Sequence, residues 1–311
     1  MGIFSSLFGG SNSHEKETEK KFDILKYDGI RAMRIGKLTY AIKCFEEATT
    51  LREDLETMTY QANAYARLDR MDDARNILER AAQLEPRQAT TYLSLANLCY
   101  ITEDYVAMNK ACQEALTLDA NLASAHLLSA KASLALGNGI QAIASLTRAI
   151  VLDETYVEAY QLRAEVLWQM RQVKDASEDI NRLLEMNPED ENALLLKAEL
   201  VAAEGRGEEA LNIIDEVLTL NPFCEKAYLL KGNYFFAIKE LDRSIAVYDE
   251  AIEINPNFAS AYHERGRVKL AKGDKQGSME DMKRAIELAP EQSAAISGEY
   301  HNYEQERNIP F

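Results

Sequence analysis

The residues that could carry out catalysis or bind a metal are few and scattered. The four histidines never stand at the spacing that puts two metal ligands on one helix face, and no cysteine lies near them. They are His14, His126, His263 and His301. No P-loop, no Gly-x-Ser-x-Gly elbow and no His-Glu-x-x-His sequence occurs. The sequence therefore predicts no catalytic residues, no metal site and no bound cofactor, and we do not expect an enzyme.

One glycine-rich segment matches a nucleotide-binding motif in its letters alone. Residues 137–142, Gly-Asn-Gly-Ile-Gln-Ala, have the Gly-x-Gly-x-x-Ala form of a dinucleotide-binding loop. That loop has to follow a β-strand, because the strand and the next helix hold the glycines against the pyrophosphate. The segment before it, Ala-Lys-Ala-Ser-Leu-Ala-Leu, is in register with helical segments elsewhere in the chain. We interpret the glycines as a turn between two helices.

Charge and cysteine content limit the partners and the location. The formal net charge of −16 and the isoelectric point of about 4.8 would repel a phosphate backbone, so we expect no nucleic-acid partner. Cys44, Cys99, Cys112 and Cys224 fit no zinc or redox spacing. Thiols that pack as small apolar groups are typical of a reducing compartment, which predicts a cytoplasmic protein.

The elements that would position any site recur at a fixed interval. Five of the six prolines lie on one lattice whose gaps are multiples of 34 residues: Pro86, Pro188, Pro222, Pro256 and Pro290. The same interval selects small residues in columns that begin at Ala62, Ala74 and Ala81. The first column continues as Ala96, Ala130, Ala164, Ala198, Gly232 and Gly266. Small side chains at a repeated position let neighbouring helices approach closely.

Each interval is interpreted as helix, turn, helix and loop. The first helix often ends at a glycine, as at Gly137, Gly205 and Gly273, and glycine can adopt the left-handed conformation there at little cost. The second helix ends before an Asn-Pro pair, because proline removes a backbone donor and biases its predecessor away from helix. The sequence thus predicts an all-α fold.

This pattern resembles the tetratricopeptide repeat family. The clearest match is the unit at 225–258, which contains Tyr228, Lys231, Gly232, Phe235, Ser244, Tyr248, Ala251 and Pro256. The resemblance covers about residues 22–290 and implies a right-handed superhelical solenoid of about eight antiparallel helix pairs.

The interval divides the chain into the following expected segments. They are a flexible apolar patch and charged linker at 1–21, a divergent repeat at 22–54, seven repeats at 55–88, 89–122, 123–156, 157–190, 191–224, 225–258 and 259–290, and a capping helix and tail at 291–311. Between the first two repeats the register is one residue short.

In this family the concave wall, formed by the first helix of each pair, is the usual binding surface. The resemblance places these residues on that wall: Tyr60, Asn63, Asn97, Tyr100, Leu127, Lys131, Leu162, Glu165, Trp168, Leu196, Glu199, Leu230, Asn233, Phe236, His263 and Arg267. Their middle portion is apolar, so we expect an adaptor or scaffold that holds a partner peptide or helix. The other interpretation is that one leucine of each Leu-Leu pair belongs to the core.

Several alternatives remain open at this point. Ile3, Phe4, Leu7 and Phe8 could tether a membrane-surface assembly factor through an interfacial helix. No apolar run approaches the length that spans a bilayer. Lysine and arginine outnumber acidic residues at 259–290, which would suit an acidic partner segment or a solvated helix face. Self-association through the groove or the terminal helices is a further alternative.

Overall fold

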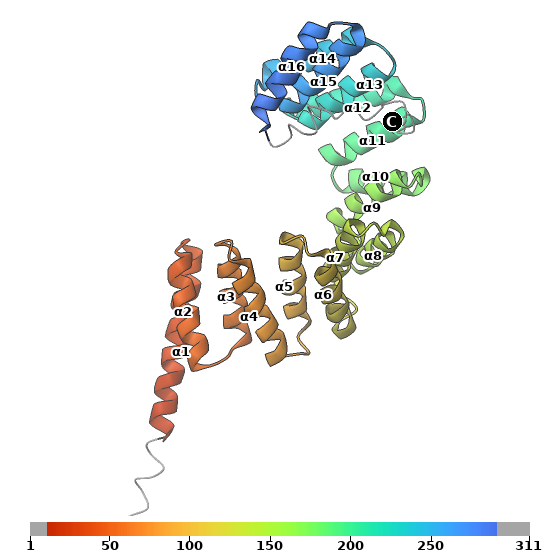
Figure 1. Cartoon of the computed structure of the whole chain (residues 1–311). Helices are drawn as coiled ribbons and strands as arrows, with labels where there is room; N and C mark the ends of the chain where they lie inside the picture. The colour runs from red at the N-terminus through yellow and green to blue at the C-terminus, as the bar shows by residue number, and fades with distance from the viewer. Residues whose placement is uncertain (1–10, 291–311) are drawn as a thin grey trace, which may run out of the picture. The chain divides into compact units, whose positions relative to one another are not determined.

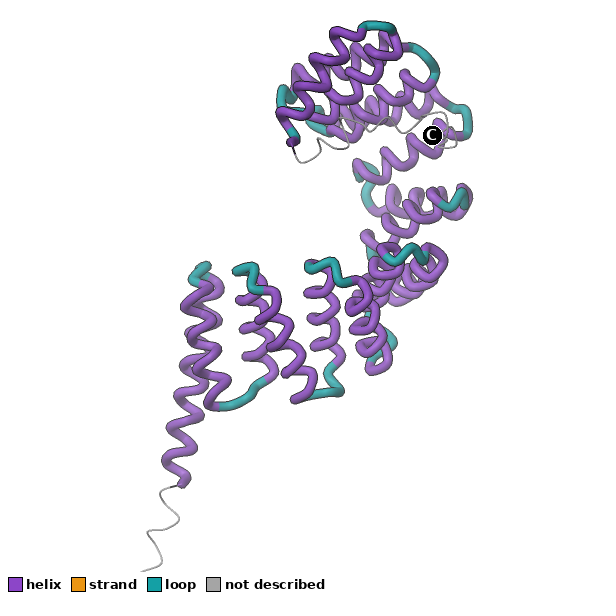
Figure 2. Tube along the Cα trace, viewed as in Figure 1, coloured by secondary structure: helices purple, strands orange, loops and turns teal. Residues whose placement is uncertain are grey.

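The computed structural model describes residues 11–290, and every regular element in that range is an α-helix (Figure 2). Sixteen helices follow one another there as eight pairs (Figure 1). They are α1 (Ser11–Arg34), α2 (Leu38–Leu51), α3 (Leu55–Ala66), α4 (Met71–Leu84), α5 (Ala89–Ile101), α6 (Tyr105–Leu118), α7 (Ala123–Ala135), α8 (Gly139–Leu152), α9 (Val157–Gln169), α10 (Val173–Met186), α11 (Glu191–Ala203), α12 (Gly207–Leu220), α13 (Glu225–Ala237), α14 (Leu241–Ile254), α15 (Ala259–Lys272) and α16 (Lys275–Leu288). The expected all-α fold of helix pairs is confirmed.

The helices form two compact units, residues 1–159 and 160–311, and the division falls within the first turn of α9. In the first unit, α1 to α8 pack in chain order, and the first helices α1, α3, α5 and α7 also contact one another in sequence. In the second unit the same order runs from α10 to α16, with α11, α13 and α15 in contact. Each unit thus builds a core that continues from one pair to the next, as stacked repeats do.

The small-residue columns lie at the helix contacts. Ala62, Ala74 and Ala81, which begin the three columns, are all buried, and so are their equivalents in each later repeat. The closest approach is at Gly232 in α13, where an added Cβ would lie 2.3 Å from Cζ of Tyr248 in α14. Ser244 Oγ also donates to the carbonyl of Gly232 at 2.8 Å. Small residues here set the helix spacing, as the sequence predicted.

A left-handed residue ends the first helix of every pair. Four of these residues are the glycines Gly36, Gly137, Gly205 and Gly273, and four are not glycine: Asp69, Glu103, Arg171 and Lys239. Their spacing is 34 residues throughout, apart from the first interval of 33. The fold therefore imposes this conformation even where the side chain opposes it.

The loops before α7, α9, α11, α13 and α15 contain a repeated Asn or Asp turn. Oδ1 of Asn187, Asn221 and Asn255 accepts from the backbone N–H two residues later, at 3.0–3.2 Å. The loop between α2 and α3 has three residues, whereas the loop between α4 and α5 has four. The one-residue slip in register is therefore a shortened loop, and it leaves the helix pairs intact.

Helix α1 differs from the expectation, because it begins at Ser11 and so includes residues 11–21, assigned above to a flexible linker. Glutamate and lysine dominate this stretch, and both have high helix propensity. Phe22, buried in the same helix, anchors the segment to the core. The apolar patch at 3–8 and the expected capping helix at 291–311 lie outside the described residues. Within the described residues, no helix combines the length and the apolar character needed to cross a membrane.

Candidate functional site

A groove in the second unit lies across the first helices α9, α11 and α13. Its volume is about 380 Å³. The lining residues are Glu165, Trp168, Gln169, Asn192, Leu195, Leu196, Glu199, Lys226, Leu229, Leu230 and Asn233. The four leucines and Trp168 give it an apolar floor. Because these residues recur at the same level of successive first helices, the helix repeat itself builds the groove.

Six of the residues expected on the concave wall are brought together here: Glu165, Trp168, Leu196, Glu199, Leu230 and Asn233. Trp168 and the two named leucines are half-buried, so part of each side chain faces solvent. Leu195 is core, while Leu196 faces the groove, and both Leu229 and Leu230 line it. One leucine therefore belongs to the core in the Leu195–Leu196 pair, whereas both leucines contribute to the groove in the Leu229–Leu230 pair.

The charged groups of the groove are Glu165, Glu199 and Lys226. Trp168 Nε1 donates to Glu199 Oε2 at 3.2 Å. Burial raises the pKa of the Glu199 carboxyl, the Trp168 hydrogen bond and Lys226 oppose the rise, and Glu165 adds to it. Lys226 Nζ donates to Asn192 Oδ1 at 3.5 Å. Two carboxylates and one ammonium group thus share a largely apolar surface.

Phe236, His263 and Arg267 form a second group of expected wall residues, on α13 and α15. The Arg267 guanidinium lies over the Phe236 ring, 5.8 Å from its centroid. His263 Nδ1 and Arg267 Nη1 contact the two carboxylate oxygens of Glu264, at 3.1 and 2.7 Å. Glu264 therefore holds both side chains in place, and its carboxylate neutralises the Arg267 guanidinium.

In the first unit, a hollow of about 320 Å³ lies between α3, α4 and α5. Asn63 and Asn97 line it, and the Asn97 amide donates to the carbonyl of Leu93 in its own helix at 3.0 Å. Tyr60, also expected on the wall, is half-buried and stacks on Phe45 of α2, with ring centroids 6.1 Å apart. This hollow is smaller than the groove and has no aromatic side chain in its lining.

The remaining expected residues fall in different surroundings. Tyr100 is exposed, and the ammonium of Lys131 lies 4.9 Å from its ring centroid while also contacting Glu158 at 2.6 Å. Leu127 is only 3% exposed, so it belongs to the core and does not contribute to a binding surface. Leu162 is half-buried. Leu128 is also buried, at 6% exposed, so both leucines of a Leu-Leu pair can belong to the core, which the repeat spacing alone did not predict.

Asn192 and Lys226 are polar groove residues that the expected wall did not include. Asn192 and Lys226 stand 34 residues apart in the first turns of α11 and α13. They form a column of their own, seven residues before the column of Glu199 and Asn233. The lattice could have identified them, since seven residues bring a helix back to nearly the same face.

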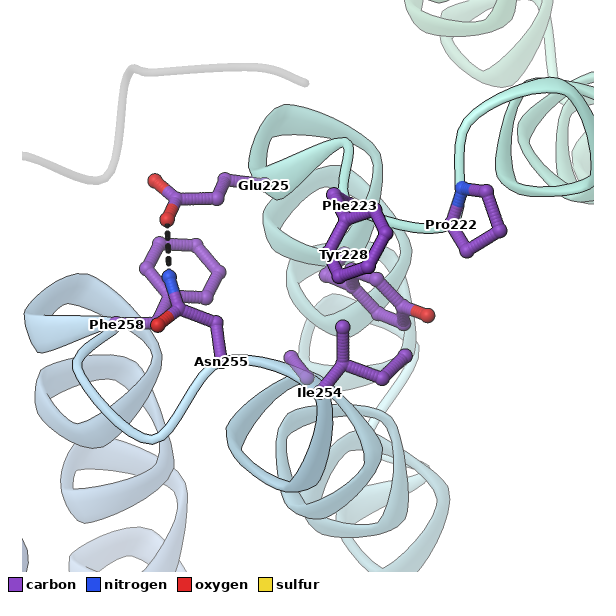
Figure 3. Close-up of a pocket in the computed structure, with 8 residues that line it drawn as sticks. Pro222, Phe223, Glu225, Tyr228, Ile254, Asn255 and Phe258 are labelled. Carbon is purple, nitrogen blue, oxygen red and sulfur yellow. Dashed lines mark hydrogen bonds between the residues drawn. The ribbon is translucent and has the colours of Figure 1, made fainter.

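A further hollow of about 210 Å³ lies at the loop edge of the second unit, outside the groove. Figure 3 shows the Phe223 and Tyr228 rings beside Ile254, and the hydrogen bond from the Asn255 amide to Glu225 Oε1, at 2.8 Å. Phe223 is 72% exposed. At the equivalent loop position the other repeats have polar residues: Arg87, Asn121, Thr155, Glu189 and Asn257. That departure from the repeat is the signal that could have identified this hollow.

The basic side chains of the last repeat are mostly paired within the chain. Arg265 makes two hydrogen bonds to Asp281, at 2.9 and 2.6 Å, and a third to Asp249 at 2.5 Å. Lys269 contacts Asp281 at 2.8 Å, and Lys272 pairs with Asp242. These pairs join α15 to α14 and α16. The excess of basic residues at 259–290 therefore serves largely to hold helices together.

The segments that suggested chemistry have structural positions. Gly137 is the left-handed residue between α7 and α8, so the glycine-rich segment follows a helix and not a strand. All four cysteines are buried free thiols, and burial raises the pKa of Cys112 to about 12. In residues 11–290 no three His, Cys, Asp or Glu side chains are grouped to hold a metal ion.

Comparison with known families and structures identifies the repeat. Family models described as tetratricopeptide repeat match residues 162–223 and 259–292, and a model described as TPR repeat matches residues 232–273. No curated protein matches the sequence.

Several solved structures are similar over most of this chain. A tetratricopeptide repeat protein from Parabacteroides merdae has a TM-score of 0.67 at 18% identity, over 78% of this chain and 99% of the other. The pilF protein of Pseudomonas aeruginosa has a TM-score of 0.59 at 14% identity, over 70% and 99%. One chain of the Cut9–Hcn1 hetero-tetramer of the APC/C has a TM-score of 0.55 at 14% identity, over 81% of this chain and 50% of the other. At identities this low, the structural similarity shows a shared fold alone.

Proposed function

Because the chain belongs to the tetratricopeptide repeat family, we propose that it is an adaptor that holds a segment of a partner protein in the groove of α9, α11 and α13. The observation that carries this proposal is the apolar floor of the groove, where Trp168, Leu196 and Leu230 are only half-buried. Apolar side chains gathered in a concave surface are typical of protein interaction sites.

The dimensions suit a segment of chain better than a small molecule. The groove crosses three first helices, and the helix repeat carries the same surface from one helix to the next. A partner peptide or helix would place an apolar side chain at each helix it crosses. The Cut9–Hcn1 hetero-tetramer, of which one chain has a similar fold, is an assembly of two different proteins. The proposal assigns no catalytic step to the groove, and places the adaptor in the cytoplasm, where its free thiols would stay reduced.

The experiment is affinity capture from native extract with three forms of the full chain. In Leu230→Asp, a charge replaces a half-buried leucine of the groove floor. In Leu220→Asp, the same change is made at an exposed leucine at the end of α12, outside the groove. We expect the wild type and Leu220→Asp to retain the same partner, and Leu230→Asp to lose it by about ten-fold, the effect of about 1.4 kcal/mol.

Far-UV circular dichroism should show equal helix content in all three forms. If Leu230→Asp and the wild type retained the partner equally, with both proteins folded, the groove would not be part of the binding surface. Loss of the partner from both variants would place binding elsewhere in the second unit.

A further inference from the structure

A column of polar residues whose charges change along the chain recurs on the first helices, and three of its members, Glu165, Glu199 and Asn233, line the groove. The column has one member on each first helix from α3 to α15: Asn63, Asn97, Lys131, Glu165, Glu199, Asn233 and Arg267. Its two cations are neutralised by the chain itself. Lys131 Nζ lies 2.6 Å from Glu158 Oε1, and Arg267 Nη1 lies 2.7 Å from Glu264 Oε2. Its two acidic members differ from them.

Neither Glu165 nor Glu199 has an ion-pair partner in the described part of the chain. Among the described residues, Trp168 Nε1 donates to Oε2 of Glu199. Lys226 is the only cation in the groove lining, and its Nζ donates to Asn192. The Lys226 charge opposes the rise in the pKa of Glu199, but in the described part of the chain Lys226 makes no ion-pair contact with either carboxylate.

A segment that covered this floor would remove water from both carboxylates. Burying an unpaired carboxylate is strongly unfavourable, whereas a cation beside it recovers much of the lost hydration energy. An acidic segment would add repulsion to that loss, because like charges across an interface disfavour binding. The chain as a whole, with a net charge of −16, attracts basic segments and repels acidic ones.

We propose that the groove of α9, α11 and α13 selects a basic segment, in which a Lys or Arg side chain lies between Glu165 and Glu199 and apolar neighbours contact Trp168, Leu196 and Leu230. This proposal rests on the groove being the binding surface, as proposed above. It adds the sign of the charge that the partner presents.

The test uses the purified full chain and synthetic peptides of about 15 residues, a length at which isolated helices are marginally stable. One peptide alternates leucine with lysine at helical spacing, a second has glutamate in place of lysine, and a third has glutamine. Trp168 is the only tryptophan of the chain, and it lines the groove, so its fluorescence reports binding at this place.

Two double variants separate a local effect from the charge of the whole protein. Glu165→Gln with Glu199→Gln removes both groove carboxylates. Glu216→Gln with Glu253→Gln removes two exposed carboxylates from α12 and α14, and so reduces the net negative charge by the same amount. We expect the lysine peptide to bind wild type at least ten-fold more tightly than the glutamate peptide. The groove double variant should lose that preference, and the control should retain it.

Other outcomes overturn the proposal in distinguishable ways. Equal binding of the three peptides, all abolished by Leu230→Asp, would refute the charge selection and leave the groove as the binding surface. A lysine preference that the two double variants reduce equally would be an effect of net charge and would also refute it. Peptide binding that Leu230→Asp leaves unchanged, or no binding by any peptide, would refute this proposal, and the capture experiment would then decide on the groove.

Discussion

Replacing Gly232 with alanine tests whether small residues set the distance between paired helices. The new Cβ would lie 2.3 Å from Cζ of Tyr248 and 2.7 Å from its hydroxyl oxygen. Carbon atoms in contact are normally about 3.5–4.0 Å apart, so the helices or the ring would have to move by more than 1 Å. The Tyr248 ring is fully buried, and its hydroxyl donates to Asn233 Oδ1 at 3.0 Å. Movement of the ring would therefore strain a packed core and weaken that hydrogen bond.

The opposing contributions can be compared. Overpacking of a core typically costs about 1–3 kcal/mol, and a lost hydrogen bond costs about 1 kcal/mol. Alanine in place of glycine inside a helix favours folding by about 1 kcal/mol. The expected net result is a loss of about 1–3 kcal/mol in the free energy of unfolding, since the steric term exceeds the helix propensity.

The assay is urea unfolding of the full chain, followed by far-UV circular dichroism, for four proteins: wild type, Gly232→Ala, Tyr248→Leu and the double variant. Leucine is shorter than tyrosine and leaves room for the new methyl group. We therefore expect Gly232→Ala to be neutral or stabilising in the Tyr248→Leu background, which makes the two changes strongly coupled. The reasoning would be wrong if Gly232→Ala stabilised the protein with Tyr248 in place, or if it were equally harmful in both backgrounds.

Three further predictions concern the turn, the groove and a helix cap. Lys239 has φ of 64°, so Lys239→Gly should leave stability equal or raise it by up to about 1 kcal/mol in thermal unfolding, whereas Gly137→Ala should lower it by about 1 kcal/mol. Burial raises the pKa of the Glu199 carboxyl, so the native state binds the carboxyl proton more tightly than the unfolded chain does. The free energy of unfolding therefore falls as the pH rises above the ordinary carboxyl pKa, and the loss is complete above the native pKa. Glu199→Gln should therefore raise the melting temperature at neutral pH and give no gain in acid, below the ordinary carboxyl pKa; a gain of equal size at both pH values would contradict this. Asp104 accepts from a backbone N–H at the start of α6 at 3.1 Å, so Asp104→Ala should cost about 1 kcal/mol in urea unfolding and Asp104→Asn less, because asparagine retains a cap acceptor; equal losses would show that the charge matters more than the cap.

The repeat could be predicted from the sequence because close contacts between helices require small residues at fixed positions. The column that begins at Ala62 contains only alanine and glycine, and it marks helix contacts where a larger side chain would overpack the core. The left-handed turn was predicted where glycine occupies it. Arg171 and Lys239 occupy the same place without any local signal, because the packing of the flanking helices imposes the conformation there.

The site was harder to predict, because exposure depends on how each pair packs and not on its position in the repeat. Leu128 and Leu230 occupy the same place in the first helices, three repeats apart, yet the former is core and the latter lines the groove. Lys131 of α7 was expected to face a partner, and Glu158 of α9, the first helix of the next pair, neutralises it. Such contacts join residues from different repeats, and the residue types at one repeat do not encode them.

The most direct test of the account is whether a partner lies against the groove in native extract. A photoreactive benzoylphenylalanine would replace Gln169, an exposed residue of the groove lining, in one protein. In a matched control it would replace Asn212, which is exposed on α12 outside that lining. The account predicts a crosslinked adduct with another protein from position 169 and none from position 212. The same adducts from both positions, or adducts from position 212 alone, would contradict it.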